Sequence, residues 1–157
     1  MTWRGSTTPS DRFFACLPYL LPLVEGLVFG SYLFREFPDL RIILLPLTPV
    51  LQLFAAIPFA ELIIFFGLYF LVVRNENISH FIRFNAMQAI LLDIILVLCG
   101  LIFRIMSGGI PGFILETIYN TLFLGLIAAF VYVVVQSIRG QYAEIPGISD
   151  AVYMQVR

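Results

Sequence analysis

The sequence contains no lysine, one histidine and only two cysteines, and 12% of its residues are charged. An ordinary globular domain has about 25% charged residues. The formal net charge of -1 gives no basic surface for nucleic-acid phosphates, so nucleic acid is not an expected partner. A soluble fold of 157 residues could not hide a composition that is 61% hydrophobic. We therefore expect an integral membrane protein with the lipid bilayer as its main surroundings.

The residue types that carry most enzyme chemistry do not occur at the spacings that catalytic or metal sites require. Cys16 and Cys99 lie in apolar segments without a CxxC pattern, which predicts buried, reduced thiols. His80 has no second metal ligand at a useful spacing, so we expect it in a solvated loop at headgroup level. No nucleophile-base pair, phosphate-binding glycine loop or paired carboxylates can be found. The sequence predicts no enzyme activity, no metal and no cofactor.

Long apolar runs dominate the chain and predict an all-α, polytopic membrane protein. One transmembrane domain, residues 13–138, is expected between a polar N-terminal segment and a polar tail, residues 1–12 and 139–157. Pro18 and Pro22 should make the early part of the first span kinked or irregular. The predicted bilayer crossings are about 13–34, 57–73, 84–103 and 113–138.

The apolar stretch from Ile42 to Val73 is too long for one crossing. As a single helix it would measure roughly 48 Å, against about 30 Å of hydrocarbon. Its prolines, at positions 46, 49 and 58, predict a break. We interpret residues 42–56 as an interfacial or re-entrant arm before the span 57–73, with a fifth crossing as the alternative.

The arginines predict the orientation, because cytoplasmic loops carry the positive excess. Four crossings place six arginines on one side and three on the other, so both termini are expected to be cytoplasmic or stromal. The six are Arg4, Arg12, Arg74, Arg83, Arg139 and Arg157, and the three are Arg35, Arg41 and Arg104. Five crossings would weaken this asymmetry.

Four carboxylates lie within apolar segments: Glu25, Glu61, Asp93 and Glu116. Because a charge at the bilayer centre is costly, each should face protein or water. Glu61 either sits at the mouth of a helix after Pro58 or lines a cavity. Glu116 and Asn120 share one helix face and either form an interhelical clasp or line a path.

A stripe of small and polar residues marks the third predicted crossing. Asn85, Ala89, Asp93 and Gly100 fall within about 80° of one another, with Gln88 at the edge. The stripe could pack against a neighbouring helix, line a hydrophilic path, or do both. Gly26 and Gly30 form a GxxxG pair, a weak signal for close helix contact and a homo-oligomer.

Three stretches of the sequence resemble a known family. They are Ile57–Asn75, Arg83–Ile94 and the shorter Leu17–Leu23, supported by Tyr119-Asn120-Thr121 and the ending Gln155-Val156-Arg157. From about Leu17 onward the chain is similar to the twenty-kilodalton subunit of TIC, the translocon at the inner envelope membrane of chloroplasts, and to its cyanobacterial relatives.

This resemblance implies a four-helix subunit that helps to move unfolded precursor polypeptides with other translocon subunits. It implies stromal termini, in agreement with the arginine count. The absence of a transit peptide favours a cyanobacterial or plastid-encoded member, in the plasma or thylakoid membrane or in the chloroplast inner envelope. Four or five thin helices can hardly enclose a channel wide enough for a polypeptide. Further copies or other subunits should therefore complete the wall of such a channel. A small-solute or ion channel and a membrane assembly or scaffold factor are the alternatives.

Overall fold

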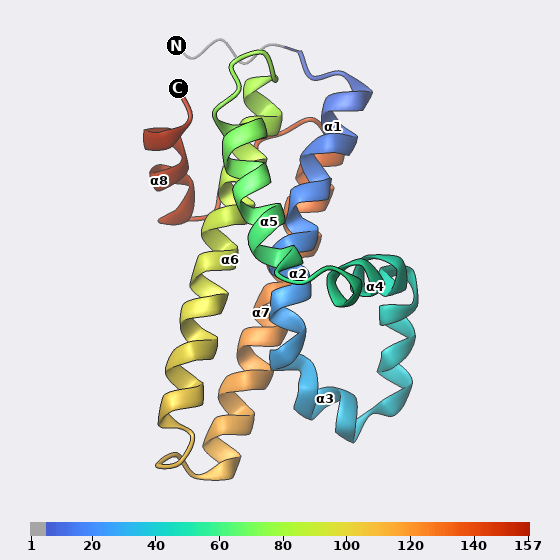
Figure 1. Ribbon diagram of the computed structural model, residues 1–157, viewed down its shortest axis with the longest axis vertical. Helices are drawn as coiled ribbons and strands as arrows, with labels where there is room; N and C mark the ends of the chain where they lie inside the picture. The colour runs from blue at the N-terminus through green and yellow to red at the C-terminus, as the bar shows by residue number, and fades with distance from the viewer. Residues whose placement is uncertain (1–5) are drawn as a thin grey trace.

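The structure, a computed structural model, describes residues 6–157, and every regular element in that range is a helix. The prediction of an all-α fold is confirmed. Three long helical segments lie side by side and run the length of the molecule (Figure 1). They are Pro9–Glu36, α6 (His80–Met106) and α7 (Gly112–Ile138).

The first long segment is continuous but irregular. It consists of α1 (Pro9–Cys16), η1 (Leu17–Tyr19), α2 (Leu20–Gly26), η2 (Leu27–Gly30) and α3 (Ser31–Glu36), in which η1 and η2 are 3₁₀ turns. A capping box starts α1, because Thr8 accepts from the Asp11 amide and Asp11 accepts from the Thr8 amide. Pro18 lies in η1 and cannot donate a backbone hydrogen bond, which explains the tightened turn there, whereas Pro22 lies inside α2.

Helices α6 and α7 run in opposite directions and are joined by a short connection (Figure 1). The Ser79 hydroxyl caps α6 by accepting from the amide of Ile82 at 3.4 Å. The connection at residues 107–111 contains Gly108, Gly109 and Pro111, which end one helix and start the next. The first segment packs against both helices, with α2 mainly on α6 and with η2 and α3 on α7.

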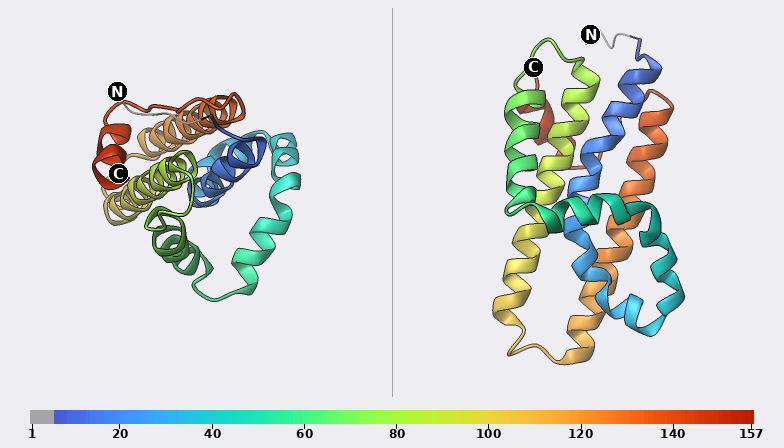
Figure 2. Two further views of the ribbon diagram at one scale, coloured as in Figure 1. Left: turned by 90° about the horizontal axis from the view of Figure 1, so that it is seen from above. Right: turned by 45° about the vertical axis from the view of Figure 1, so that its right-hand side comes forward.

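An arm made of η3 (Pro38–Leu47) and α4 (Thr48–Ala56) stands away from this bundle (Figure 2). None of its residues is buried. In Figure 1, α4 runs across the long axis of the bundle, whereas η3 runs along it. The arm therefore presents an apolar surface that this chain covers little.

The chain turns back toward α6 after the arm. Phe59 adopts a left-handed conformation with φ of 59°, the only positive φ outside glycine in residues 6–157. It precedes α5 (Ala60–Gly67) and the π-helical η4 (Leu68–Val73), which packs on α6. These two helices contain 8 and 6 residues, or roughly 21 Å together at 1.5 Å per residue.

Four segments are long and apolar enough to cross a membrane: Pro9–Glu36, Pro38–Ala56, His80–Met106 and Gly112–Ile138. Three of them overlap predicted crossings. The fourth overlaps the predicted arm, while Ala60–Val73 is shorter. The division into an arm at 42–56 and a crossing at 57–73 therefore stays a prediction.

The tail after α7 folds back onto the bundle. It contains α8 (Ile148–Gln155) and buries Ala143, Val152 and Val156. Val152 and Val156 join a core cluster with Phe84 and Ile90 of α6. Figure 1 shows that α8 lies near the end of the bundle at which α1 begins. Residues 139–157 are thus part of the packed structure.

Candidate functional site

A buried hydrogen-bond network surrounds Asn85 on α6. The Asn85 side chain is fully buried, and its Oδ1 accepts from the Tyr19 hydroxyl at 2.9 Å and from Ser137 Oγ at 3.3 Å. Its Nδ2 donates to the Phe81 carbonyl at 2.8 Å. Asn85 thereby ties α6 to η1 and to the end of α7.

Gln88, one turn further along α6, continues this network into the tail. Its Nε2 donates to the Tyr19 hydroxyl at 3.0 Å and to the Ala143 carbonyl at 2.8 Å. Its Oε1 accepts from Ser149 Oγ at 2.8 Å. Every polar atom of both amides has a partner, and such satisfied networks stabilise one specific arrangement of helices. The geometry favours the interhelical-contact interpretation for these two residues.

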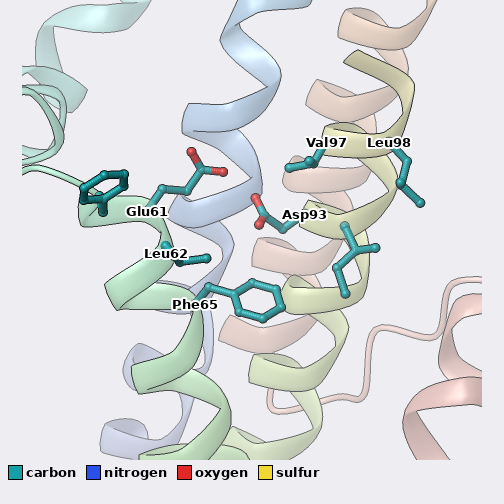
Figure 3. Close-up of a pocket in the computed structure, with 8 residues that line it drawn as sticks. Glu61, Leu62, Phe65, Asp93, Val97 and Leu98 are labelled. Atoms are coloured by element: carbon teal, nitrogen blue, oxygen red, sulfur yellow. The ribbon is translucent and has the colours of Figure 1, made fainter. Parts of the chain in front are cut away.

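Asp93 lies on the same helix but in different surroundings. Its side chain is 2% exposed, and its Oδ1 has no hydrogen-bond partner within residues 6–157. It lines a cavity of about 450 Å³ together with Glu61 from the first turn of α5. Figure 3 shows the two carboxyl groups facing each other across this space. We call this space the carboxylate cavity; apolar side chains form its other walls, namely Phe59, Leu62, Phe65, Ile94, Val97 and Leu98.

A third carboxylate reaches the same place from α2. The Glu25 carboxyl group lies near the Glu61 carboxyl group, and both lie near enough to Asp93 for their charges to act on it. Three helices far apart in the sequence therefore bring three acidic groups together. None of the three makes an ion pair in the part of the chain that the structure describes.

This arrangement concentrates negative charge in apolar surroundings. Like charges at short range in a low dielectric repel strongly, so protons or a cation must balance them. Residues 6–157 offer no group of three or more His, Cys, Asp or Glu side chains placed to hold a metal ion. The carboxylate cavity is the main candidate site of the chain.

Glu116 and Asn120 lie apart from this cavity, on α7. Both are half-buried, and the Asn120 Oδ1 atom is buried without a partner among the described residues. The structure places no hydrogen bond between them within residues 6–157. Their role as a clasp or a path lining stays a prediction.

The small residues of the sequence lie at close helix contacts within the chain. A Cβ added to Gly26 would collide with Leu126 of α7, and one added to Gly30 would lie 2.8 Å from Phe123 Cε2. Ala89 is buried in a cluster with Tyr19, and Gly100 faces Phe29. The GxxxG pair is thus occupied by an intramolecular interface.

The cysteines and the histidine lie partly open to the surroundings. Cys16 and Cys99 are both free thiols and are half-buried, less buried than the sequence predicted. His80 is exposed, as expected, but it also forms contacts: Nδ1 lies 2.9 Å from the Tyr142 hydroxyl and Nε2 lies 3.3 Å from the Val156 carbonyl. His80 therefore helps to hold the tail.

Comparison with known proteins identifies the family. A model of the family described as "Chloroplast import apparatus Tic20-like" matches residues 9–152, most of the chain. The chain belongs to the Tic20 family. It is 53% identical to a Tic20 family protein of Synechocystis sp. over 159 residues, covering 100% of this chain and 99% of the relative.

Two further relatives carry Tic20 names, and one of them is a chloroplast protein. The chain is 37% identical to the protein TIC 20-II, chloroplastic, of Arabidopsis thaliana, covering 99% of this chain and 78% of the relative. It is 36% identical to the Tic20 family protein Ycf60 of Porphyra purpurea, covering 99% and 80%. The resemblance inferred from the sequence is confirmed, as is the assignment to an integral membrane protein.

Sequence reasoning identified only part of this Tic20 site. It singled out Asn85, Gln88, Asp93 and Glu61 as polar residues in apolar segments. It noted Glu25 without a role, although the unusual cost of an acid inside a span was the available signal. It missed Tyr19, Ser137 and Ser149, because hydroxyl groups are common in membrane helices and nothing local marks their distant partners.

Proposed function

We propose that this Tic20-family chain is a non-enzymatic membrane subunit of a protein translocon. The observation that carries the proposal is the match of residues 9–152 to a family described as chloroplast import apparatus. The chain would help precursor polypeptides to cross the chloroplast inner envelope or the corresponding cyanobacterial membrane. Other translocon subunits and the precursors themselves are the expected partners.

The packing of the bundle supports a shared pathway and argues against a channel inside one copy. The Asn85 and Gln88 side chains lie at the contact between α6, η1, α7 and the tail. Their polar groups hydrogen-bond to Tyr19, Ser137 and the Ala143 carbonyl. A wet path along the bundle axis would have to break these bonds. A polypeptide would instead pass along a surface that further copies or other subunits complete. A small-solute or ion channel would likewise require several copies.

One observation favours an assembly or scaffold function as the second candidate. The arm Pro38–Ala56 is apolar and buries none of its residues in this chain. A partner helix that packs on the arm would remove this surface from lipid and gain dispersion contacts. A scaffold function requires partner binding without contact with the transported polypeptide.

Site-specific photocrosslinking in the native membrane can test the translocon proposal. A photoreactive amino acid placed at Leu62, at the rim of the carboxylate cavity, is compared with one at Val131 on α7, since both positions are 53% exposed. A precursor is arrested during import, and crosslinked products are identified by mass spectrometry. Crosslinks to the precursor from Leu62 and few from Val131 support the proposal. Crosslinks to membrane proteins alone at both positions would contradict it and favour a scaffold.

A further inference from the structure

The carboxylate cavity is lined by two acidic side chains and by no basic side chain. Asp93 is nearly fully buried, points into the cavity in Figure 3, and leaves Oδ1 unpartnered in the described chain. A buried polar atom without a partner is uncommon in folded proteins, since desolvation without a hydrogen bond is costly. The unsatisfied atom and the adjacent Glu61 and Glu25 carboxyl groups indicate a ligand that donates hydrogen bonds and carries positive charge.

The arginines within residues 6–157 do not provide that charge. Arg83 Nε donates to the Val73 carbonyl at 2.9 Å and its Nη1 to the Arg157 carbonyl at 3.1 Å, near the end of the bundle that carries the tail. Arg12 donates to the Ile138 carbonyl at 3.3 Å. No arginine within residues 6–157 pairs with the cavity carboxylates. A cation that balances these carboxylates would therefore come from outside residues 6–157.

The walls of the cavity determine which cation fits. Side chains such as Leu62, Phe65 and Leu98 offer no oxygen ligands, whereas hard metal ions prefer six or more. These walls suit a cation with an apolar stem, such as the methylene chain of arginine or lysine. Leu62 and Leu98 are 53% and 51% exposed, so the cavity rim lies at the surface of the bundle. The volume of about 450 Å³ falls in the usual range of ligand pockets, roughly 300–1,000 Å³.

We propose that the carboxylate cavity receives an arginine or lysine side chain from a second polypeptide lying in the membrane. Asp93 and Glu61 accept hydrogen bonds from the guanidinium or ammonium group, Glu25 adds negative charge, and the apolar walls contact the methylene stem. This inference rests on the proposed function, because a translocon subunit meets foreign polypeptides in the membrane. A basic side chain inside a bilayer needs a charged or hydrogen-bonding partner. The cavity supplies such a partner, whereas the hydrocarbon chains of lipid do not.

Binding of a synthetic membrane-spanning peptide tests this proposal on the full chain in lipid nanodiscs. One peptide has about 20 leucine and alanine residues with a central arginine, and the other has citrulline, its neutral isostere, at the same position. Fluorescence transfer between labelled peptide and protein measures the affinity. We expect the arginine peptide to bind at least about tenfold more tightly, since charged hydrogen bonds are stronger than neutral ones.

Variants of the cavity residues test whether the preference for the arginine peptide arises in the cavity. Asp93→Asn and Glu61→Gln should each reduce the preference for arginine over citrulline several-fold, whereas Glu116→Gln, a carboxylate on α7 outside the cavity, should retain it. Equal affinity for both peptides, or an unchanged preference in Asp93→Asn, would overturn the proposal. Displacement by free n-butylguanidinium without any preference between the peptides would also overturn it and indicate a small-molecule cation site.

The crosslinking experiment separates this proposal from the proposed function. If Leu62 crosslinks the arrested precursor equally with and without basic residues in the nearby precursor segment, the translocon function stands and the cation preference fails. If crosslinks disappear when those residues are replaced by glutamine and the yield at Val131 is unchanged, both are supported.

Discussion

The hydroxyl group of Tyr19 lies 2.9 Å from Asn85 Oδ1 and 3.0 Å from Gln88 Nε2, so one side chain of the first helical segment joins two amides of α6. The hydroxyl donates to Asn85 and accepts from Gln88. Both amides are fully buried. The position of the first segment on α6 therefore depends on a hydrogen-bond pattern as well as on apolar packing.

Replacement of Tyr19 by phenylalanine should destabilise the bundle by about 1–3 kcal/mol, because the Gln88 N–H group loses an acceptor in a dry interior. Tyr132→Phe is the matched control, since the Tyr132 hydroxyl donates to the Glu144 carbonyl at an exposed position. Its effect should be below about 0.5 kcal/mol. Denaturant unfolding in detergent, followed by circular dichroism, measures both. Equal effects of the two variants would show that the buried network does not stabilise the bundle.

Cysteine labelling can test whether water reaches the centre of the bundle. In a background with Cys16 and Cys99 replaced by alanine, Asn85→Cys should resist a water-soluble maleimide, because position 85 is fully buried. Gln141→Cys, at an exposed position in the tail, should react rapidly. Labelling of both at similar rates in the folded protein would demonstrate a wet path past Asn85 and would favour the channel alternative.

Alanine at Gly26 should destabilise the fold by roughly 1–3 kcal/mol, because its Cβ would force Leu126 to move in a packed interface. Gly125→Ala on α7 serves as the control, since a Cβ there meets nothing within 4 Å. The control should be neutral or stabilising by up to about 1 kcal/mol from helix propensity. Thermal unfolding in detergent distinguishes them. If Gly26→Ala instead dissociated an oligomer without changing the unfolding temperature, the glycines would belong to an intermolecular contact.

Protease protection can test the predicted orientation. Tags on the two termini should either both be cut or both be protected, because the start of α1 and helix α8 lie toward the same end of the bundle (Figure 1). A protease site inserted into the 107–111 turn should have the opposite accessibility. Loss of one terminal tag with protection of the other would require an odd number of crossings, as in the five-crossing alternative.

Much of the fold follows from local features of the sequence, and the site follows only partly. Apolar runs, Pro18, Pro22 and the Gly108-Gly109 turn predict helices, irregular turns and a break, because each acts within a few residues. The meeting of Glu25, Glu61 and Asp93 depends on the packing of three distant helices. No local rule specifies such packing. The helical periodicity of α6 alone does not show that Gln88 lies in a helix contact whereas Asp93 lines a cavity.

The arm shows a second limit of sequence reasoning. Its prolines predict a break, and the structure bends between η3 and α4. Hydropathy alone cannot decide whether such a bent segment crosses the bilayer or lies in its surface, because both positions suit apolar residues.

The return of the tail to α6 has a consequence for biosynthesis. Ala143 and Ser149 are made after α7, yet they supply two of the partners of the Gln88 amide. While α6 and α7 enter the membrane, that amide has only the Tyr19 hydroxyl, and lipid offers no replacement. Before the tail is made, the Gln88 amide therefore lacks two of the partners that it has in the folded protein.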